Sequence, residues 1–286
     1  MGFKKVVVVG GGVLGSQIAY QVAYKGFDVT VWLRSEGSIG RAKPKFERWH
    51  ETYKKDLEAT KVLIGTDTKL YPRGLVDDFA SLTPEKIDAL KEQADKAYEG
   101  LIYELDMAKA MADADLVIES LSEDPKAKIE FYQAMAPLLP EKTVVVTNSS
   151  TMLPSTFASY TGRPEKYLAL HFANEIWKNN TAEIMGHPGT AQKYYDEVVA
   201  FAKEIFSAGS VPECRTGLIC KRRNRSANYR SDLDAWNWST TWTVPYSGYC
   251  RTGYRLQYRN DESRGKESRD ITGQDCHSSE RIYRCR

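Results

Sequence analysis

The stretch KKVVVVGGGVLGSQIAYQVAYKG, residues 4–26, decides the fold of this 286-residue chain. Its four consecutive valines, 6–9, predict a short strand that is buried on both faces of a parallel sheet. A glycine-rich turn, GGGVLG at 10–15, follows directly, and the apolar residues after it recur at helical spacing. The order strand, glycine turn, helix is typical of a βαβ unit whose first turn binds phosphate groups.

Three glycines of this turn, Gly10, Gly12 and Gly15, match the pattern G-x-G-x-x-G. The first permits the tight turn, the second lets the backbone approach a pyrophosphate, and the third lets the helix pack closely on the strand. The start of the helix, with Val13 and Leu14, supplies unpaired N–H groups and partial positive charge to the phosphates. Together these features predict a dinucleotide-binding site.

The end of a second predicted strand, 27–33, indicates which dinucleotide binds. An acidic residue at that end would bind the ribose 2′-hydroxyl of NAD. This chain has Arg34 and Ser35 instead, and an arginine beside a hydroxyl suits the 2′-phosphate of NADP. We therefore expect NAD or NADP as the cofactor, with NADP favoured. The alternative is that Arg34 is only a solvated surface charge.

Three further apolar runs predict strands of the same sheet: 115–120, 143–147 and 167–172. A helix is predicted between the first two, at 125–138. Strands that alternate with helices predict an α/β fold with a doubly wound, parallel Rossmann sheet. Such sheets bind ligands beyond the carboxyl ends of their strands. Because Glu123, Ser150 and His171 all fall at strand ends, we expect one crevice to collect them.

A charged region between the second and third strands predicts a helical insertion, residues 36–100. Its segment KPKFERWHETYKKDLEATKV, 43–62, has the spacing of an exposed amphipathic helix. The lysines of this segment could meet an anionic substrate. A solvated helix face is the commoner role for such charges.

Residues 4–205 contain four motifs: GGGVLG at 10–15, VIESLSED at 117–124, TNSST at 147–151 and HFANEIWKNNTAEIM at 171–185. Together they resemble the 3-hydroxyacyl-CoA dehydrogenase family. That family oxidises the C3 hydroxyl of a 3-hydroxyacyl-CoA, or reduces the corresponding ketone, with a nicotinamide cofactor. The resemblance implies an enzyme, an acyl-CoA substrate and a homodimer, and we predict no metal site.

The resemblance also implies roles for single residues. His171 matches the family's general base, and Glu183, twelve residues later, matches its carboxylate partner. Histidine suits removal of the hydroxyl proton because its ordinary pKa is about 6.5, and a carboxylate on the far ring nitrogen fixes the tautomer. Ser150 matches the serine that hydrogen-bonds the reacting oxygen, and Asn174 matches an asparagine near the nicotinamide and the substrate. Glu123 and Lys128 match residues on the nicotinamide side, and we assign Asn148 to the cofactor as well.

Two features depart from the family pattern. The family usually has proline after its His-Phe-Phe-Asn motif, whereas Glu175 follows Asn174 here, which leaves the acyl group open. The family also continues with a helical domain that shapes the acyl pocket and the dimer interface, and no helical apolar period follows residue 206. The alternative enzyme is a dehydrogenase of a free 3-hydroxy acid.

The charge and cysteine content change in the same region. Residues 1–211 contain 25 basic residues, 29 acidic residues and no cysteine, whereas 212–286 contain 15 basic residues, 9 acidic residues and all five cysteines. The cysteine-free first part without a signal peptide, and the lack of an apolar run near the roughly 20 residues of a membrane span, predict a cytoplasmic protein without membrane contact. We therefore divide the chain into a dinucleotide-binding domain, 1–205, and a second region, 206–286.

The stretch WNWSTTW, 236–242, raises three interpretations of the second region. The odd number of cysteines disfavours a disulfide module. A basic, aromatic arm that binds RNA is the disfavoured rival from another functional class. The third is a displaced reading frame: the tryptophan codon TGG, read one base later, begins a glycine codon, and 236–263 then resembles the family's own next domain. We favour this interpretation and expect a poorly ordered region, with dinucleotide binding but poor acyl-CoA turnover.

Overall fold

The computed structural model describes residues 2–68, 70–179, 181–206, 257–258 and 283–284. In the C-terminal region it contains one short antiparallel pair, β8 (Gln257–Tyr258) with β9 (Tyr283–Arg284). The tryptophan-rich stretch and the cysteines lie outside the described residues, as does the segment 236–263 of the predicted displaced frame except for residues 257–258.

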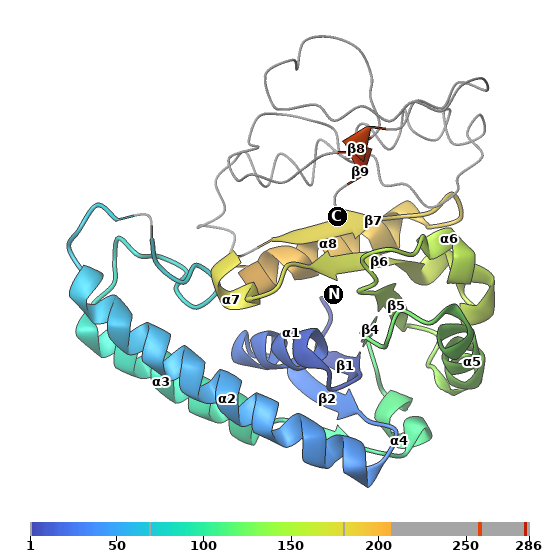
Figure 1. Ribbon diagram of the computed structural model, residues 1–286, viewed down its shortest axis with the longest axis horizontal. Helices are drawn as coiled ribbons and strands as arrows, with labels where there is room; N and C mark the ends of the chain where they lie inside the picture. The colour runs from blue at the N-terminus through green and yellow to red at the C-terminus, as the bar shows by residue number, and fades with distance from the viewer. Residues whose placement is uncertain (1, 69, 180, 207–256, 259–282, 285–286) are drawn as a thin grey trace. The chain divides into compact units, whose positions relative to one another are not determined.

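A seven-stranded sheet forms the centre of the N-terminal part, in the order β3-β2-β1-β4-β5-β6-β7 (Figure 1). The strands are β1 (Lys5–Val9), β2 (Asp28–Trp32), β3 (Ile102–Glu104), β4 (Leu116–Glu119), β5 (Val144–Thr147), β6 (Tyr167–Phe172) and β7 (Ala182–Met185). Six of these strands run parallel, so the predicted Rossmann sheet is confirmed.

The edge strand β7 was not predicted, and it runs antiparallel to β6. Nine residues, 173–181, connect the two strands. A parallel return needs a crossover of about a dozen residues or more, so a connection this short favours an antiparallel neighbour. The edge strand β3, three residues long, was also missed.

Helices cover both faces of the sheet (Figure 1). One face packs against α1 (Val13–Tyr24), α2 (Glu36–Thr60), α3 (Pro84–Glu99) and α8 (Gln192–Phe206). The other packs against α4 (Met107–Met111), α5 (Pro125–Met135) and α6 (Pro154–Phe157). The short helix α7 (Ile176–Asn179) follows β6. Helix α5 continues as a 3-10 turn to Leu138, which matches the helix predicted at 125–138.

The valines of β1 divide between the two hydrophobic cores. Val6 and Val8 belong to one core, Val7 and Val9 to the other, and all four are at most 2% exposed. Alternate residues of a strand point to opposite faces, so an unbroken apolar run is what a doubly covered strand requires. Burial of each valine stabilises the fold by about 1.5 kcal/mol or more.

The inserted helices α2 and α3 lie side by side as a long pair next to α1 (Figure 1). Helix α2 begins earlier than the predicted segment because Ser35 caps it, its hydroxyl accepting a hydrogen bond from the Ser38 N–H. The buried amide of Gln21 on α1 anchors this side of the molecule. It accepts a hydrogen bond from the Tyr53 hydroxyl at 2.6 Å and donates to the carbonyl oxygens of Gly74 and Ile205.

Among the described residues, no helix combines the length and the apolar character that a membrane span requires.

Replacement of Gly15 by alanine is expected to destabilise this fold. A β-carbon at Gly15 would lie 2.4 Å from the Gly10 carbonyl oxygen, and backbone cannot give way as a flexible side chain can. We expect the free energy of unfolding in urea to fall by about 2 kcal/mol or more. The matched control is Gly40→Ala in the exposed part of α2, where a β-carbon meets nothing within 4 Å. It should leave stability equal or raise it by about 0.5–1 kcal/mol. Equal unfolding midpoints for the two variants would contradict this packing.

Candidate active site

The glycine turn joins β1 to α1 beside the end of β4. Gly10 has a φ of +105°, and a β-carbon there would lie 2.7 Å from the Ser120 carbonyl oxygen. Gly15 packs against the turn itself, whereas a β-carbon at Gly12 would meet no atom within 4 Å. The steric reasons predicted for Gly10 and Gly15 are therefore present, and Gly12 leaves open space on one side of the turn.

The start of α1 opens toward this space. Val13, its first residue, is 58% exposed, and Leu14 is half-buried. Gly12 at the N-cap has no side chain to accept from the first N–H groups, and the first turn contains no acidic residue. N–H groups at such a helix start attract phosphate. The glycine turn and the start of α1 together form a cradle that fits the pyrophosphate of a dinucleotide. Contact by Val13 and Leu14 stays a prediction.

At the end of β2 the side chain of Arg34 is exposed. Its neighbour Ser35 has a structural task as the cap of α2, and its hydroxyl also lies 3.0 Å from the Ser38 hydroxyl. The Arg41 guanidinium donates to that Ser38 hydroxyl, at 3.0 Å. A second arginine, which the sequence analysis did not single out, therefore stands at the same helix start as Arg34.

His171 and Glu183 are cross-strand partners in the β6–β7 ladder. His171 Nδ1 lies 3.2 Å from Glu183 Oε2. Directly opposed residues project from the same face of a sheet, so the spacing of twelve residues corresponds to one antiparallel return. The two side chains keep 25% and 39% of their surface exposed. With Nδ1 turned to the carboxylate, Nε2 is the ring nitrogen that can face a substrate.

The segment after β5 lies beside the end of β6. Asn148 Oδ1 accepts a hydrogen bond from the Phe172 N–H at 2.9 Å, one residue beyond His171. Ser149 is buried, and its hydroxyl donates to Glu123 Oε2 at 2.6 Å. Ser150, in contrast, is exposed. The same edge of the sheet therefore carries the predicted Ser150, Asn148 and His171, with Glu123 joined to them through Ser149.

Lys128 differs from the other predicted residues because its side chain is buried. Its Nζ lies 2.6 Å from Glu119 Oε1 and 3.8 Å from Glu123 Oε1. The second oxygen of Glu119 accepts hydrogen bonds from the hydroxyls of Tyr132, at 2.9 Å, and Thr147, at 2.7 Å. Burial raises the pKa of Tyr132 well above its ordinary value, and the nearby Glu119 carboxylate adds to the shift. The Lys128 ammonium therefore stabilises the carboxylates of both Glu119 and Glu123. Its place on the nicotinamide side stays a prediction.

Asn174 is exposed and lies two residues beyond the end of β6. The Asn179 side-chain amide donates to its backbone carbonyl oxygen. The residue after it, Glu175, donates its N–H to Gln17 Oε1 at 2.8 Å, so α1 contacts this turn.

Two residues that contact the elements of the site were not predicted from the sequence, Glu119 and Gln17. Glu119 left a usable signal, because a carboxylate inside the buried run LVIE must be paired in the fold. Gln17 left a weaker one, since a glutamine among apolar helix residues is often solvated.

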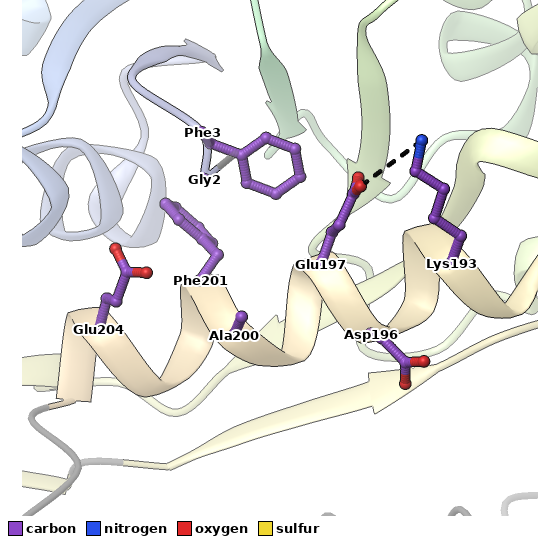
Figure 2. A pocket seen from close by; sticks show the side chains of 8 residues that line it. All are labelled: Gly2, Phe3, Lys193, Asp196, Glu197, Ala200, Phe201 and Glu204. Carbon is purple, nitrogen blue, oxygen red and sulfur yellow. Dashed lines mark ion pairs between the residues drawn. The ribbon is translucent and has the colours of Figure 1, made fainter.

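A hollow of about 500 Å³ lies elsewhere, between α8 and the residues before β1. Figure 2 shows its lining, which includes the rings of Phe3 and Phe201 and the carboxylates of Asp196, Glu197 and Glu204. Lys193 pairs with Glu197 at 3.9 Å. The hollow is at the amino end of β1, opposite to the carboxyl ends where the candidate residues lie, and it contains none of them.

The sheet, the glycine turn and the open helix start define a dinucleotide-binding protein of the Rossmann class. Residues 5–212 match the family described as "3-hydroxyacyl-CoA dehydrogenase, NAD binding domain". The chain therefore belongs to the 3-hydroxyacyl-CoA dehydrogenase family.

Individual relatives agree with this membership. The mitochondrial hydroxyacyl-coenzyme A dehydrogenase of Rattus norvegicus is 26% identical over 206 residues, which are 71% of this chain and 56% of the rat protein. The 3-hydroxybutyryl-CoA dehydrogenase of Clostridioides difficile is 27% identical, over 70% of this chain and 60% of that protein. The match thus spans little more than half of these relatives.

Among solved structures, a diketoreductase described for "substrate-directed dual catalysis of dicarbonyl compounds" is 40% identical, with a TM-score of 0.59. The match covers 72% of this chain and 62% of the diketoreductase. FadB2 of M. tuberculosis, 24% identical with a TM-score of 0.54, shares the fold.

Replacement of Lys128 by methionine is expected to destabilise the protein strongly. The change leaves the Glu119 carboxylate buried without its ammonium partner. We expect the free energy of unfolding to fall by about 3–5 kcal/mol, as for other broken buried ion pairs. The control is Lys126→Met on the same helix, whose side chain is 87% exposed and which should shift stability by no more than about 0.5 kcal/mol. Similar denaturation curves for the two variants would contradict the pairing.

Proposed function

We propose that residues 5–206 form the dinucleotide-binding and proton-transfer part of a 3-hydroxyacyl-CoA dehydrogenase. The observation that carries the proposal is the contact between His171 Nδ1 and Glu183 Oε2, 3.2 Å, at the carboxyl edge of the sheet. Family membership supplies the class of reaction. The activity is a proposal for this chain because the match covers 56% of the rat dehydrogenase.

In the oxidative direction, His171 Nε2 accepts the proton of the C3 hydroxyl as the hydride leaves C3. Glu183 accepts the Nδ1 proton of the ring in a hydrogen bond, which fixes the tautomer and stabilises the imidazolium that forms. Ser150 donates a hydrogen bond to the C3 oxygen, and Asn174 orients the acyl group on the same side. A nicotinamide dinucleotide at the glycine turn would accept the hydride. In the reductive direction the imidazolium returns the proton to the C3 oxygen.

The role of the pair predicts the effect of Glu183→Gln. The amide keeps the shape of the side chain but removes the charge that stabilises the imidazolium. We expect kcat for 3-hydroxybutyryl-CoA to fall by about 100-fold or more, while the dinucleotide Kd from fluorescence titration changes less than about threefold. His171→Asn should lower kcat at least as much.

Two controls accompany this measurement. Glu197→Gln on α8, at the hollow opposite the site, should leave kcat unchanged. Dinucleotide titration of the unaltered chain comes first, since we expect its turnover to be poor. A Glu183→Gln variant that turns over at the unaltered rate would remove the basis of the proposed mechanism.

We also propose that NADP is preferred to NAD. Support comes from the exposed Arg34 at the end of β2, the absence of an acidic residue at that end, and the second guanidinium of Arg41 near the start of α2. Both arginines can pair with a 2′-phosphate in two-pronged hydrogen bonds.

Arg34→Asp tests this preference. The change removes a phosphate partner and introduces an acceptor for the 2′-hydroxyl of NAD. We expect the Kd for NADP to rise about tenfold or more and the Kd for NAD to fall. Arg48→Asp, the same charge change at an exposed position of α2, should alter neither Kd by more than about twofold. Tighter binding of NAD than of NADP by the unaltered chain would refute the preference.

The second candidate substrate is a smaller carbonyl compound without CoA, such as a free 3-hydroxy acid or a dicarbonyl. The diketoreductase favours it, because its identity of 40% exceeds the 26% of the rat acyl-CoA dehydrogenase. The assay of 3-hydroxybutyryl-CoA beside free 3-hydroxybutyrate separates the two. Retention of kcat/KM without CoA would identify the smaller substrate. Cytoplasmic location, the loss of the family's dimer interface and the lack of nucleic-acid binding stay predictions.

A further inference from the structure

The turn between β6 and α7 has a backbone conformation that proline could not adopt. Glu175 has a φ of +56°, which among the described residues is the single positive φ outside glycine. Its N–H donates to Gln17 Oε1 at 2.8 Å. The 3-hydroxyacyl-CoA dehydrogenase family usually has proline at this position, after the asparagine that Asn174 matches. Proline has a φ near −65° and no N–H. The departure noticed in the sequence is therefore a change of backbone as well as of charge.

Gln17 provides the other half of this contact. It is 3% exposed and lies on α1, two residues after Gly15, close to the helix start that forms the dinucleotide cradle. A buried amide oxygen needs a hydrogen-bond donor, and the Glu175 N–H supplies it. One side chain therefore joins the cofactor helix to the turn that follows His171.

The remaining bonds of the turn show why it keeps an unfavourable φ. The Glu175 carbonyl oxygen accepts from the N–H groups of Lys178 and Asn179, both at 2.8 Å. Two residues further along, the Trp177 indole N–H donates to Asp56 on α2 at 2.8 Å, and the Gly74 N–H donates to the Trp177 carbonyl oxygen. Such contacts on both sides hold a residue in a sparsely populated conformation.

We propose that Gln17 is a positioning residue. Through the Glu175 N–H it sets the left-handed turn from which Asn174 projects, so that the dinucleotide-binding helix and the substrate side of the site move as one unit. The inference rests on the proposed function for its meaning in catalysis. The contact itself can be tested without turnover.

Three substitutions in the full chain separate the backbone contact from the carboxylate. Gln17→Leu removes the acceptor at similar volume. Glu175→Pro removes the donor and forbids the positive φ. Glu175→Gly keeps the N–H, accepts the positive φ and removes only the carboxylate.

Hydrogen exchange of the amide at position 175 is the primary measurement, by NMR. Gln17→Leu should raise its rate about tenfold or more in the absence of nucleotide, because the buried acceptor is lost. Glu175→Gly should stay within about threefold of the unaltered chain. Dinucleotide binding should slow exchange across residues 174–176 in the unaltered chain and in Glu175→Gly. In Gln17→Leu, dinucleotide binding should no longer slow exchange at these positions. A merely structural contact would not make their exchange rate depend on the nucleotide.

The functional measurement is the split between kcat and the dinucleotide Kd. Gln17→Leu and Glu175→Pro should each lower residual kcat about tenfold, and the double variant should add little, because both remove the same hydrogen bond. An unchanged exchange rate at position 175 in Gln17→Leu would overturn the inference. If the unaltered chain binds neither dinucleotide, the proposed function is refuted. The exchange rates measured without nucleotide would still decide whether Gln17 holds the turn.

Discussion

Burial of β1 on both faces is the constraint on which the rest of the structure depends. Its valines supply both cores, so its backbone must pair with β2 and β4, and helices must cover it above and below. Parallel neighbours bring their carboxyl ends to one edge. The glycine turn ends β1 at that edge, which is why the segments after β4, β5 and β6 lie near it.

The antiparallel return of β7 adds what parallel strands alone could not. It places Glu183 directly opposite His171, with the ladder rather than a flexible loop holding the carboxylate against the ring. Such a pair is oriented before any substrate arrives, and orientation of an acid–base group is a large part of its effect. The proposed chemistry therefore depends on a single pair of adjacent strands.

Buried polar groups hold the loops of this edge in place. The Lys128 ammonium pairs with Glu119, whose carboxylate also accepts from Tyr132 and Thr147, so α5, β4 and β5 meet at one carboxylate. Glu123 holds the Ser149 hydroxyl above this cluster. On the opposite face, Gln21 joins α1 to the insertion and to α8. The exposed predicted residues are thus carried by loops whose anchors are buried.

The sequence alone determined the local elements and the family. Apolar runs marked five of the six parallel strands, all except the short edge strand β3, and the glycine spacing marked the turn, because burial and steric demands act over neighbouring residues. It also named His171 and Glu183, but only through resemblance. Tertiary structure decided their distance, the direction of β7 and the burial of Lys128, since these depend on how strands pair and how helices pack on the sheet rather than on a local residue pattern. The contact from Gln17 to Glu175 spans 158 positions, and no local pattern could reveal it.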